Sequence, residues 1–327
     1  DLMDNPHEVD RILSQLENLL LESHTGQEPQ IEFYLKLQRL RVYRALAMTD
    51  KLLQLVNEMD DNDPRLAHVD RETRGDWYHN RGLVRCWIQG DYERALHDLE
   101  RARTEFLLAG RMGWETGAIA DIGLAHWNRG ELRLAEEKLT FCKNRLVQMS
   151  DEQPRLIKII GHLGLVYLSQ GRLEEAFLIL NQQFNLAADL RYFKEMRRAR
   201  GNRGITQFHL GHYDEAITDL EGCLAATKAT NEGYAHAQVN LSRCYRAKGN
   251  YGKARELATA ALELAETKQD MGMQVIARRA LAECSPDQAE HHLQIALSTA
   301  QRNQRRFDEA ACLLSLSQRF GVNSLGE

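Results

Sequence analysis

A glycine followed five residues later by an alanine recurs five times along this chain of 327 residues, at nearly constant spacing. Successive glycines lie 38 to 41 residues apart, and they are Gly90, Gly130, Gly171, Gly211 and Gly249. A chain of this length exceeds the usual limit for one hydrophobic core, so it needs either two domains or an elongated array. The fixed period selects the array, because repeats of 20 to 50 residues are typical of solenoids. We therefore predict an all-α superhelix of tandem helix-turn-helix units.

Each unit is expected to hold two helices joined by a tight turn at the glycine, which supplies the left-handed backbone conformation that ends a helix. Positions five, nine and twelve after the glycine lie on one face of the second helix, as with Ala95, Leu99 and Ala102. Four units also carry a small residue seven places before the turn glycine, and these are Gly123, Gly164, Gly204 and Ser242. Small residues there predict close helix crossings. In the first unit Gly82 stands one place early, so we expect that unit to pack slightly differently.

This combination of small residue, turn glycine, alanine, aliphatic and small residue resembles the tetratricopeptide repeat, over about residues 66–303. The chain departs from that pattern because its units are near 40 residues instead of 34, and because the proline that usually ends a unit is missing. Such long units are similar to the sensor arms of bacterial signalling proteins, among them the maltose-regulator family and other STAND-type ATPases. The resemblance implies helix pairs stacked in a right-handed superhelix, whose concave groove binds a peptide, a protein or a small effector.

The expected organisation has three parts. Residues 1–63 form N-terminal helices that act as a degenerate or capping repeat, with helices over about 5–22, 30–48 and 51–59. Five regular repeats occupy residues 64–284, and a shortened repeat with a C-terminal capping helix occupies 285–327. Because the chain begins with Asp and not Met, we expect it to be a piece of a longer protein.

Composition narrows the class of function. A net charge of −5 disfavours a polyanion as the main partner. No phosphate loop, catalytic triad or metal-ligand spacing is present, and the adjacent His291 and His292 point about 100° apart on a helix. We therefore expect no cofactor, no metal and no enzymatic activity. The six cysteines form no paired motif and no apolar run is long enough to span a membrane, which favours buried thiols in a reducing cytoplasm.

Candidate binding residues are positions whose place in the repeat is fixed while their residue type varies. Those thirteen, nine and three places before each turn glycine share one side of the first helix, so they should line one groove. Arginine and aromatic side chains there suit binding, because they dominate interface energies. The predicted groove residues are Trp77, Arg81, Trp87, Asp121, Trp127, His162, Arg198, Asn202, His209, His236, Asn240, Arg243 and Arg246. The alternative is that the tryptophans form core between repeats and the arginines are merely solvated.

Three functions follow, in order of preference. The first is a non-enzymatic scaffold that senses or binds a protein or an acidic or mixed peptide, or a small effector, and regulates a domain outside this chain. The second follows from a resemblance to the quorum-sensing aspartate phosphatases, in which an N-terminal helical bundle acts on a phosphorylated response regulator and the repeats bind a pheromone peptide. Residues 5–59 would form that bundle here, and Gln38 or Gln54 would position the water. The third is nucleic-acid binding through the basic residues 191–203, which the acidic total charge disfavours and a solvated helix face explains more simply.

Overall fold

The computed structural model describes residues 8, 11–15, 18, 29–46, 48–58, 63–227, 234–303 and 305–320. All regular secondary structure within these ranges is helical, which confirms the all-α prediction. The chain divides into two compact units, which are Asp1–His162 and Leu163–Glu327. The boundary between them falls within helix α8 (Gln153–Ser169). The predicted helix over residues 5–22 lies largely outside the described residues.

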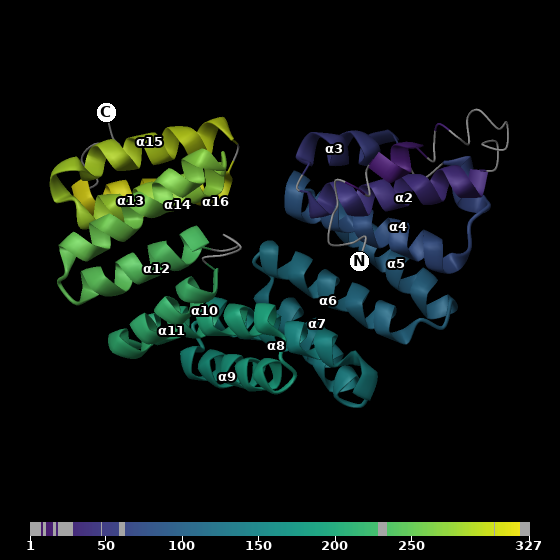
Figure 1. The fold of residues 1–327 in the computed structure, drawn as a ribbon, viewed down its shortest axis with the longest axis horizontal. Helices are drawn as coiled ribbons and strands as arrows, with labels where there is room; N and C mark the ends of the chain where they lie inside the picture. Colours follow the sequence, from purple (N-terminus) through teal and green to yellow (C-terminus); the bar gives the residue numbers. More distant parts are fainter. Residues whose placement is uncertain are drawn as a thin grey trace. The chain divides into compact units, whose positions relative to one another are not determined.

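In the first unit, consecutive helices pack side by side in chain order (Figure 1). Two helices match the N-terminal predictions closely, α2 (Pro29–Ala45) and α3 (Thr49–Glu58). The repeats follow after a 3-10 turn, Pro64–Ala67. Their elements are α4 (Arg71–Val84), the π-turn η4 (Arg85–Gln89), α5 (Tyr92–Leu108), α6 (Met112–Asn128), α7 (Leu132–Val147) and the 3-10 turn Ser150–Glu152.

The second unit continues the same alternation of first and second helices. Its elements are α9 (Leu173–Asp189), α10 (Phe193–Leu210), α11 (Tyr213–Thr227), α12 (Tyr234–Ala247), α13 (Tyr251–Thr267), α14 (Met271–Cys284), the 3-10 turn Pro286–Gln288, α15 (Ala289–Arg302) and α16 (Arg306–Phe320). Each first helix touches the next one, α10 with α12 and α12 with α14, as well as its sequence neighbours. These three helices therefore present adjoining side chains on one face of the unit.

The turn glycines behave as predicted, because all five adopt positive φ values between 66° and 82°. Twenty residues after three of them stands a second left-handed residue, which turns the chain from one repeat into the next. These residues are Gly110, Arg191 and Gln269, with φ of 70°, 56° and 54°. Two of the three are not glycine, so the sequence pattern did not reveal this second fixed point of the repeat.

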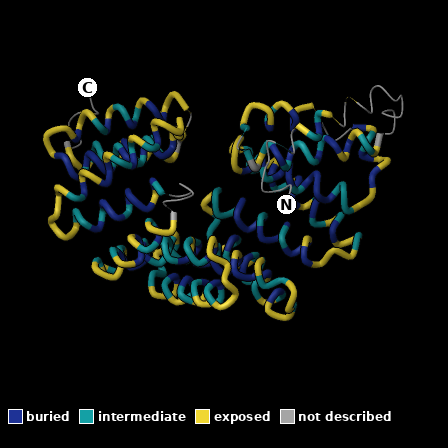
Figure 2. Tube along the Cα trace, in the orientation of Figure 1, coloured by how far each residue is buried: buried dark blue, intermediate teal, exposed yellow. Residues whose placement is uncertain are grey.

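The predicted contact face of the second helices is also confirmed. The alanine five residues after each turn glycine is completely buried in all five copies. Figure 2 shows buried residues recurring along the helices while the turns between them are exposed. A methyl group on Gly204 would lie 2.9 Å from Leu220 Cγ, so the small residues of the first helices do permit close helix crossings. Ser242, the last of these residues, donates a hydrogen bond of 2.7 Å to the Ala254 carbonyl.

The irregular spacing of the first repeat has a specific structural cause. Eight residues separate Gly82 from Gly90, where seven separate the equivalent pair in the other copies. The π-turn η4 lies between them and absorbs the extra residue, which is how single insertions are usually accommodated in helices. Gly82 thereby keeps its place, because a methyl group on it would lie 2.9 Å from Leu99 Cγ. Upstream of the π-turn, positions counted back from Gly90 are consequently one residue out of register.

Candidate functional site

Because the π-turn shifts the register by one residue, two of the predicted groove residues were assigned wrongly. Trp77 and Arg81 are both fully buried and so cannot line a groove. Trp77 packs edge-on against Phe33, with ring centroids 5.8 Å apart. The Arg81 guanidinium donates to both carboxylate oxygens of Asp98, at 2.9 and 2.5 Å. Asn80 takes the place that we assigned to Arg81, since it lies two residues before the small glycine, as Asn202 does.

The buried ion pair of Arg81 is a repeated part of the scaffold. Arg203 precedes Gly204 as Arg81 precedes Gly82, and it donates two hydrogen bonds of 2.7 Å to Asp219. An arginine next to the small residue thus reaches across to the second helix of its own repeat in both copies. Its function is to hold a helix pair together.

The remaining predicted residues of the first unit do not gather into one open site. Trp87 lies on the π-turn with 51% of its surface exposed, while Trp127 and His162 are half-buried. Asp121 lies 2.6 Å from His79 Nε2, so its carboxylate already has a partner. Polar groups on this face of the first unit are thus largely engaged with one another.

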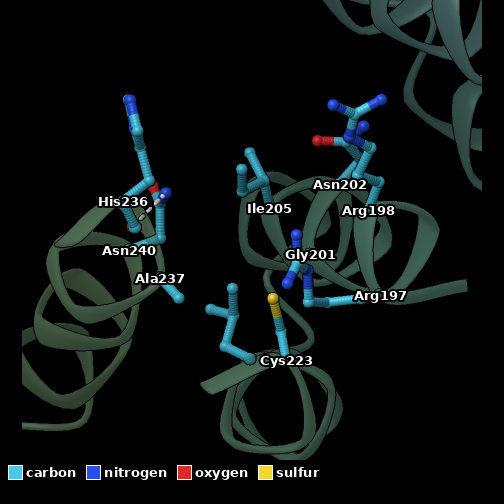
Figure 3. Close-up of a pocket in the computed structure, with 10 residues that line it drawn as sticks. Arg197, Arg198, Gly201, Asn202, Ile205, Cys223, His236, Ala237 and Asn240 are labelled. Carbon is cyan, nitrogen blue, oxygen red and sulfur yellow. Dashed lines mark hydrogen bonds between the residues drawn. The ribbon is translucent and has the colours of Figure 1, made fainter. Parts of the chain in front are cut away.

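In the second unit, four predicted residues surround one hollow of about 160 Å³ (Figure 3). Arg198 and Asn202 come from α10, and His236 and Asn240 come from α12. The floor and walls are mostly apolar, and they comprise Gly201, Ile205, Leu220, Cys223 and Ala237, with Arg197 beside them. Gly201 borders the hollow, and a methyl group there would lie 3.3 Å from Cys223 Sγ, so a larger side chain at this position would occupy the space.

The size of the hollow indicates what it can hold. Sites for drug-sized molecules usually measure about 300–1,000 Å³, whereas a cavity of about 150 Å³ accepts a molecule the size of benzene. The hollow is therefore suited to one aliphatic or small aromatic side chain. Its rim differs from its floor, since it offers amide and cationic groups that can fix the orientation of a ligand.

Hydrogen-bonding capacity remains on the two asparagines of the rim. Asn240 donates one N–H to the His236 carbonyl at 2.9 Å, and its side-chain oxygen receives a long bond of 3.4 Å from Arg243. The second amide N–H of Asn240 has no acceptor among the residues that the structure describes. The side-chain amide of Asn202 makes no hydrogen bond with any residue that the structure describes. Arg198, in contrast, donates to Glu195 at 3.1 Å.

Two histidines extend this face and are kept neutral by it. Desolvation between the helices lowers the pKa of His236 although the residue reaches the surface, and Arg243 lowers it further against the opposing effect of Asp270. Desolvation likewise lowers the pKa of His209, again with a contribution from Arg243. The structure thus brings His209 and His236 to within electrostatic range of Arg243.

Sequence reasoning missed two residues of α14, Arg279 and Glu283. Both lie close to Arg243, because Glu283 raises the pKa of that guanidinium and Arg279 lowers it, while burial lowers it most. Arg246 Nε lies 3.3 Å from Glu283 Oε2. The repeat pattern could not reach α14 because no turn glycine follows it. The left-handed Gln269, twenty residues after Gly249, is the signal that would have fixed its frame.

Other candidate chemistries have little support in the described structure. Among the described residues no group of three or more His, Cys, Asp or Glu could hold a metal ion. None of the helices within the described ranges is both long and apolar enough to cross a membrane. The basic run 191–203 does not form one strip, because Arg200 and Arg203 turn to the ring of Phe184 while Arg198 borders the hollow.

Comparisons with known proteins agree with this geometry. The family model of the tetratricopeptide repeat matches residues 195–267, a span that contains the whole hollow. The fold is a tetratricopeptide-like repeat solenoid. No curated protein sequence matches the chain significantly.

Solved structures resemble nearly the whole chain at low sequence identity. A Rap protein complexed with Competence and Sporulation Factor is 15% identical with a TM-score of 0.68, covering 97% of this chain and 96% of its own. NprR in complex with its cognate peptide NprX is 15% identical with a TM-score of 0.63, covering 97% and 96%. Aspartyl phosphate phosphatase F from Bacillus subtilis is 12% identical with a TM-score of 0.61, covering 96% and 89%. Identities this low establish similarity of fold alone.

Proposed function

We propose that this protein is a non-enzymatic scaffold that binds an extended peptide segment on the face formed by α10 and α12. The observation that carries the proposal is the hollow between these helices, with its apolar floor and its polar rim. One apolar side chain of the peptide enters the hollow, and burying it supplies about 1.5–3 kcal/mol. Asn202 and Asn240 hydrogen-bond the peptide backbone on either side, because a side-chain amide presents both a donor and an acceptor.

Two further observations support a peptide over a small effector. The volume of about 160 Å³ accommodates a single side chain, and specificity for a longer ligand then comes from neighbouring positions along the groove. NprR, whose fold is similar, has been solved with its cognate peptide. Binding would regulate a signalling or effector domain outside this chain. We place the protein in the cytoplasm, since all six cysteines are buried and free.

Phosphatase activity is the second function that we considered, and no specific contact favours it. Gln38 accepts a hydrogen bond of 3.2 Å from Arg41, and Gln54 donates one of 2.8 Å to Glu58. Both bonds are local to one helix, so neither glutamine is oriented by a site. The phosphatase hypothesis would be supported if the protein released phosphate from a phosphorylated response regulator and if Gln38→Ala or Gln54→Ala abolished that release.

A randomised peptide library tests the proposal directly. Selection on the purified protein should enrich peptides that share an apolar residue at one position, and sequencing of the selected peptides measures this enrichment. Gly201→Leu fills the hollow and should abolish that enrichment, whereas Gly201→Ala adds only a methyl group and should retain most of it. Both substitutions remove a helical glycine, so the pair separates occlusion of the hollow from any change in helix stability.

Two outcomes would contradict the proposal. If no peptide family is enriched by the wild-type protein, the peptide-binding function is wrong. If Gly201→Leu keeps its helical circular dichroism and selects the same peptides as the wild type, the hollow is not the binding site.

A further inference from the structure

The turn between α9 and α10 carries an exposed apolar patch in the second unit. Leu190, Tyr192 and Phe193 are all exposed, and Phe193 has 69% of its surface in contact with solvent. Single exposed apolar residues are common on folded proteins, whereas contiguous apolar patches mark interaction sites. We refer to residues 190–194 as the apolar tip.

Hydrogen bonds fix the backbone of the apolar tip. The Arg191 N–H donates to the Ala188 carbonyl at 3.1 Å, and the Tyr192 N–H donates to the Ala187 carbonyl at 2.8 Å. These two bonds form a Schellman motif, in which Arg191 takes the left-handed position with φ of 56°. The tip is therefore presented in one conformation, which lowers the ordering cost when it binds a partner.

The geometry of the turn does not require apolar residues. The same left-handed turn occurs at Gln269, where Lys268 and Asp270 take the places of Leu190 and Tyr192. Both of these residues are exposed and charged. Because the scaffold forms this turn equally well with polar residues, the apolar residues of the tip serve a purpose other than the turn.

An aromatic hollow in the first unit matches the apolar tip in size. It measures about 270 Å³, and its apolar lining comprises Tyr34, Leu37, Phe106 and Trp114. Tyr34 and Trp114 are exposed, so two aromatic rings of the lining are accessible to a partner. A cavity of about 150 Å³ holds benzene, so this hollow holds the phenyl ring of Phe193 with space to spare. We refer to it as the aromatic hollow.

Positive charge surrounds the apolar tip. Arg191 and Lys194 are both exposed, and Asp189 is the only exposed carboxylate between residues 189 and 195. The hollow between α10 and α12 carries charge of the same sign, from Arg197 and Arg198. Like charges therefore disfavour that hollow as the partner of the tip.

The rim of the aromatic hollow carries negative charge. Three carboxylates border it, and Glu72 and Asp76 each pair with an arginine. Asp70 instead accepts two hydrogen bonds from Thr73, at 2.8 and 2.9 Å, and none of the described cations pairs with it. One negative charge thus remains without a cation at the rim, where it attracts a basic partner.

We propose that the apolar tip of one copy of this chain docks into the aromatic hollow of a second copy. Phe193 inserts beside Tyr34 and Trp114, and Lys194 approaches the carboxylates of the rim. When a two-fold axis relates the copies, each inserts its tip and receives the tip of its partner, so the same contact forms twice. Each copy carries both complementary surfaces, so the association needs no further component.

Analytical ultracentrifugation of the full chain over a range of concentrations should show a reversible dimer. Phe193→Asp should weaken the dimer at least about a hundred-fold, because it removes a central aromatic side chain from both contacts. Leu178→Asp is the matched control, since Leu178 lies on α9 with 67% of its surface exposed but outside the tip. It should change the dimerisation constant less than about two-fold. Circular dichroism verifies that both variants are folded.

A charge exchange tests whether the two surfaces meet. Lys194→Glu and Glu72→Lys should each weaken the dimer about ten-fold, because each places like charges across both contacts. In an equimolar mixture of the two variants, a mixed dimer joins opposite charges at both contacts. The mixture should therefore recover the wild-type affinity to within about three-fold. Misfolding of either variant could not be reversed by mixing.

Several results would overturn the proposal. A monomer at every concentration excludes self-association, and a dimer that Phe193→Asp leaves unchanged uses another surface. A mixture of the charge variants that stays as weak as its components shows that the tip and the aromatic hollow do not meet. If the protein is monomeric but binds phosphatidylserine vesicles through Phe193, the partner of the tip is a lipid surface. None of these measurements depends on peptide binding.

Discussion

The first-helix faces of the two units share one repeat frame but differ in charge. In the first unit, a hollow of about 270 Å³ is lined by Asp70, Glu72 and Asp76. All three carboxylates have partners, since Asp76 pairs with Arg41, Glu72 pairs with Arg111, and Asp70 accepts two hydrogen bonds from Thr73. In the second unit, the hollow of about 160 Å³ has an arginine and a histidine on its rim, and a surplus of guanidinium groups lies beside it. One face is acidic and internally paired, whereas the other is basic and incompletely paired.

This difference shows how a repeat array can concentrate binding at one place. The glycine, alanine and leucine positions are common to both units, so they establish the stack without selecting a ligand. Charges that are paired within the fold contribute to stability, and charges without an internal partner remain available to a ligand. We therefore expect substitutions in the first unit to affect stability, and substitutions on the basic face of the second unit to affect binding.

The largest expected effect is the loss of Asp98, which carries the carboxylate that pairs with the fully buried Arg81. Asp98→Ala should destabilise the first unit by about 3–5 kcal/mol. The equivalent Asp219→Ala should cost about 1–3 kcal/mol, because Arg203 is partly exposed. Urea unfolding followed by tryptophan fluorescence reports on the first unit, which contains all four tryptophans, while circular dichroism reports on both. Equal destabilisation by the two substitutions would show that burial does not set the cost.

A cation removed from either face should have opposite consequences. Arg41→Gln deprives Asp76 of its partner in the first unit and should lower stability while peptide affinity changes less than about two-fold. Arg246→Gln in the second unit should reduce the affinity for a selected acidic peptide at least about five-fold with little loss of stability. Fluorescence anisotropy with the labelled peptide measures the affinity of both variants, and urea unfolding measures their stability. A similar loss of affinity in the two variants would remove the functional distinction between the faces.

A smaller effect on the free energy of unfolding is expected at Ser242, where a side-chain hydrogen bond stands in place of the close helix contact that a glycine makes in other repeats. Ser242 donates to the Ala254 carbonyl, whereas Gly204 occupies the same place in the previous repeat without a side chain. Ser242→Ala should cost about 1 kcal/mol in urea unfolding monitored by circular dichroism. Ser298→Ala, at an exposed serine of α15, serves as the control and should stay within about 0.5 kcal/mol of the wild type.

The smallest effect concerns pH. The pKa of His236 is lowered in the folded protein from its ordinary value of 6.5, so the unfolded chain binds the proton more readily. Stability contributed by the neutral ring is therefore complete above about pH 6.5 and decreases as the pH falls below that value. His236→Gln should make the urea midpoint of the second unit less dependent on pH between 7 and 5.5. An unchanged dependence would show that other groups control it.

The repeat frame was predictable from the sequence because each of its features is local. A positive φ requires glycine at the turn, and close helix crossings require small residues at fixed spacing, so both leave a regular signal. The candidate site was predictable only in part. Arg198, Asn202, His236 and Asn240 do meet around one hollow, but Trp77 and Arg81 were wrong because a π-turn shifts the register by one residue.

The sequence by itself therefore determined the helix pairs, their period and the face on which they stack. Only the tertiary structure decided which polar residues are neutralised inside the fold and which remain available to a ligand. Pairing depends on neighbours in adjoining helices, as between Arg246 and Glu283 or between Arg81 and Asp98, and no spacing along the chain reports such contacts. For the same reason the contribution of α14 to the basic face became visible only in three dimensions.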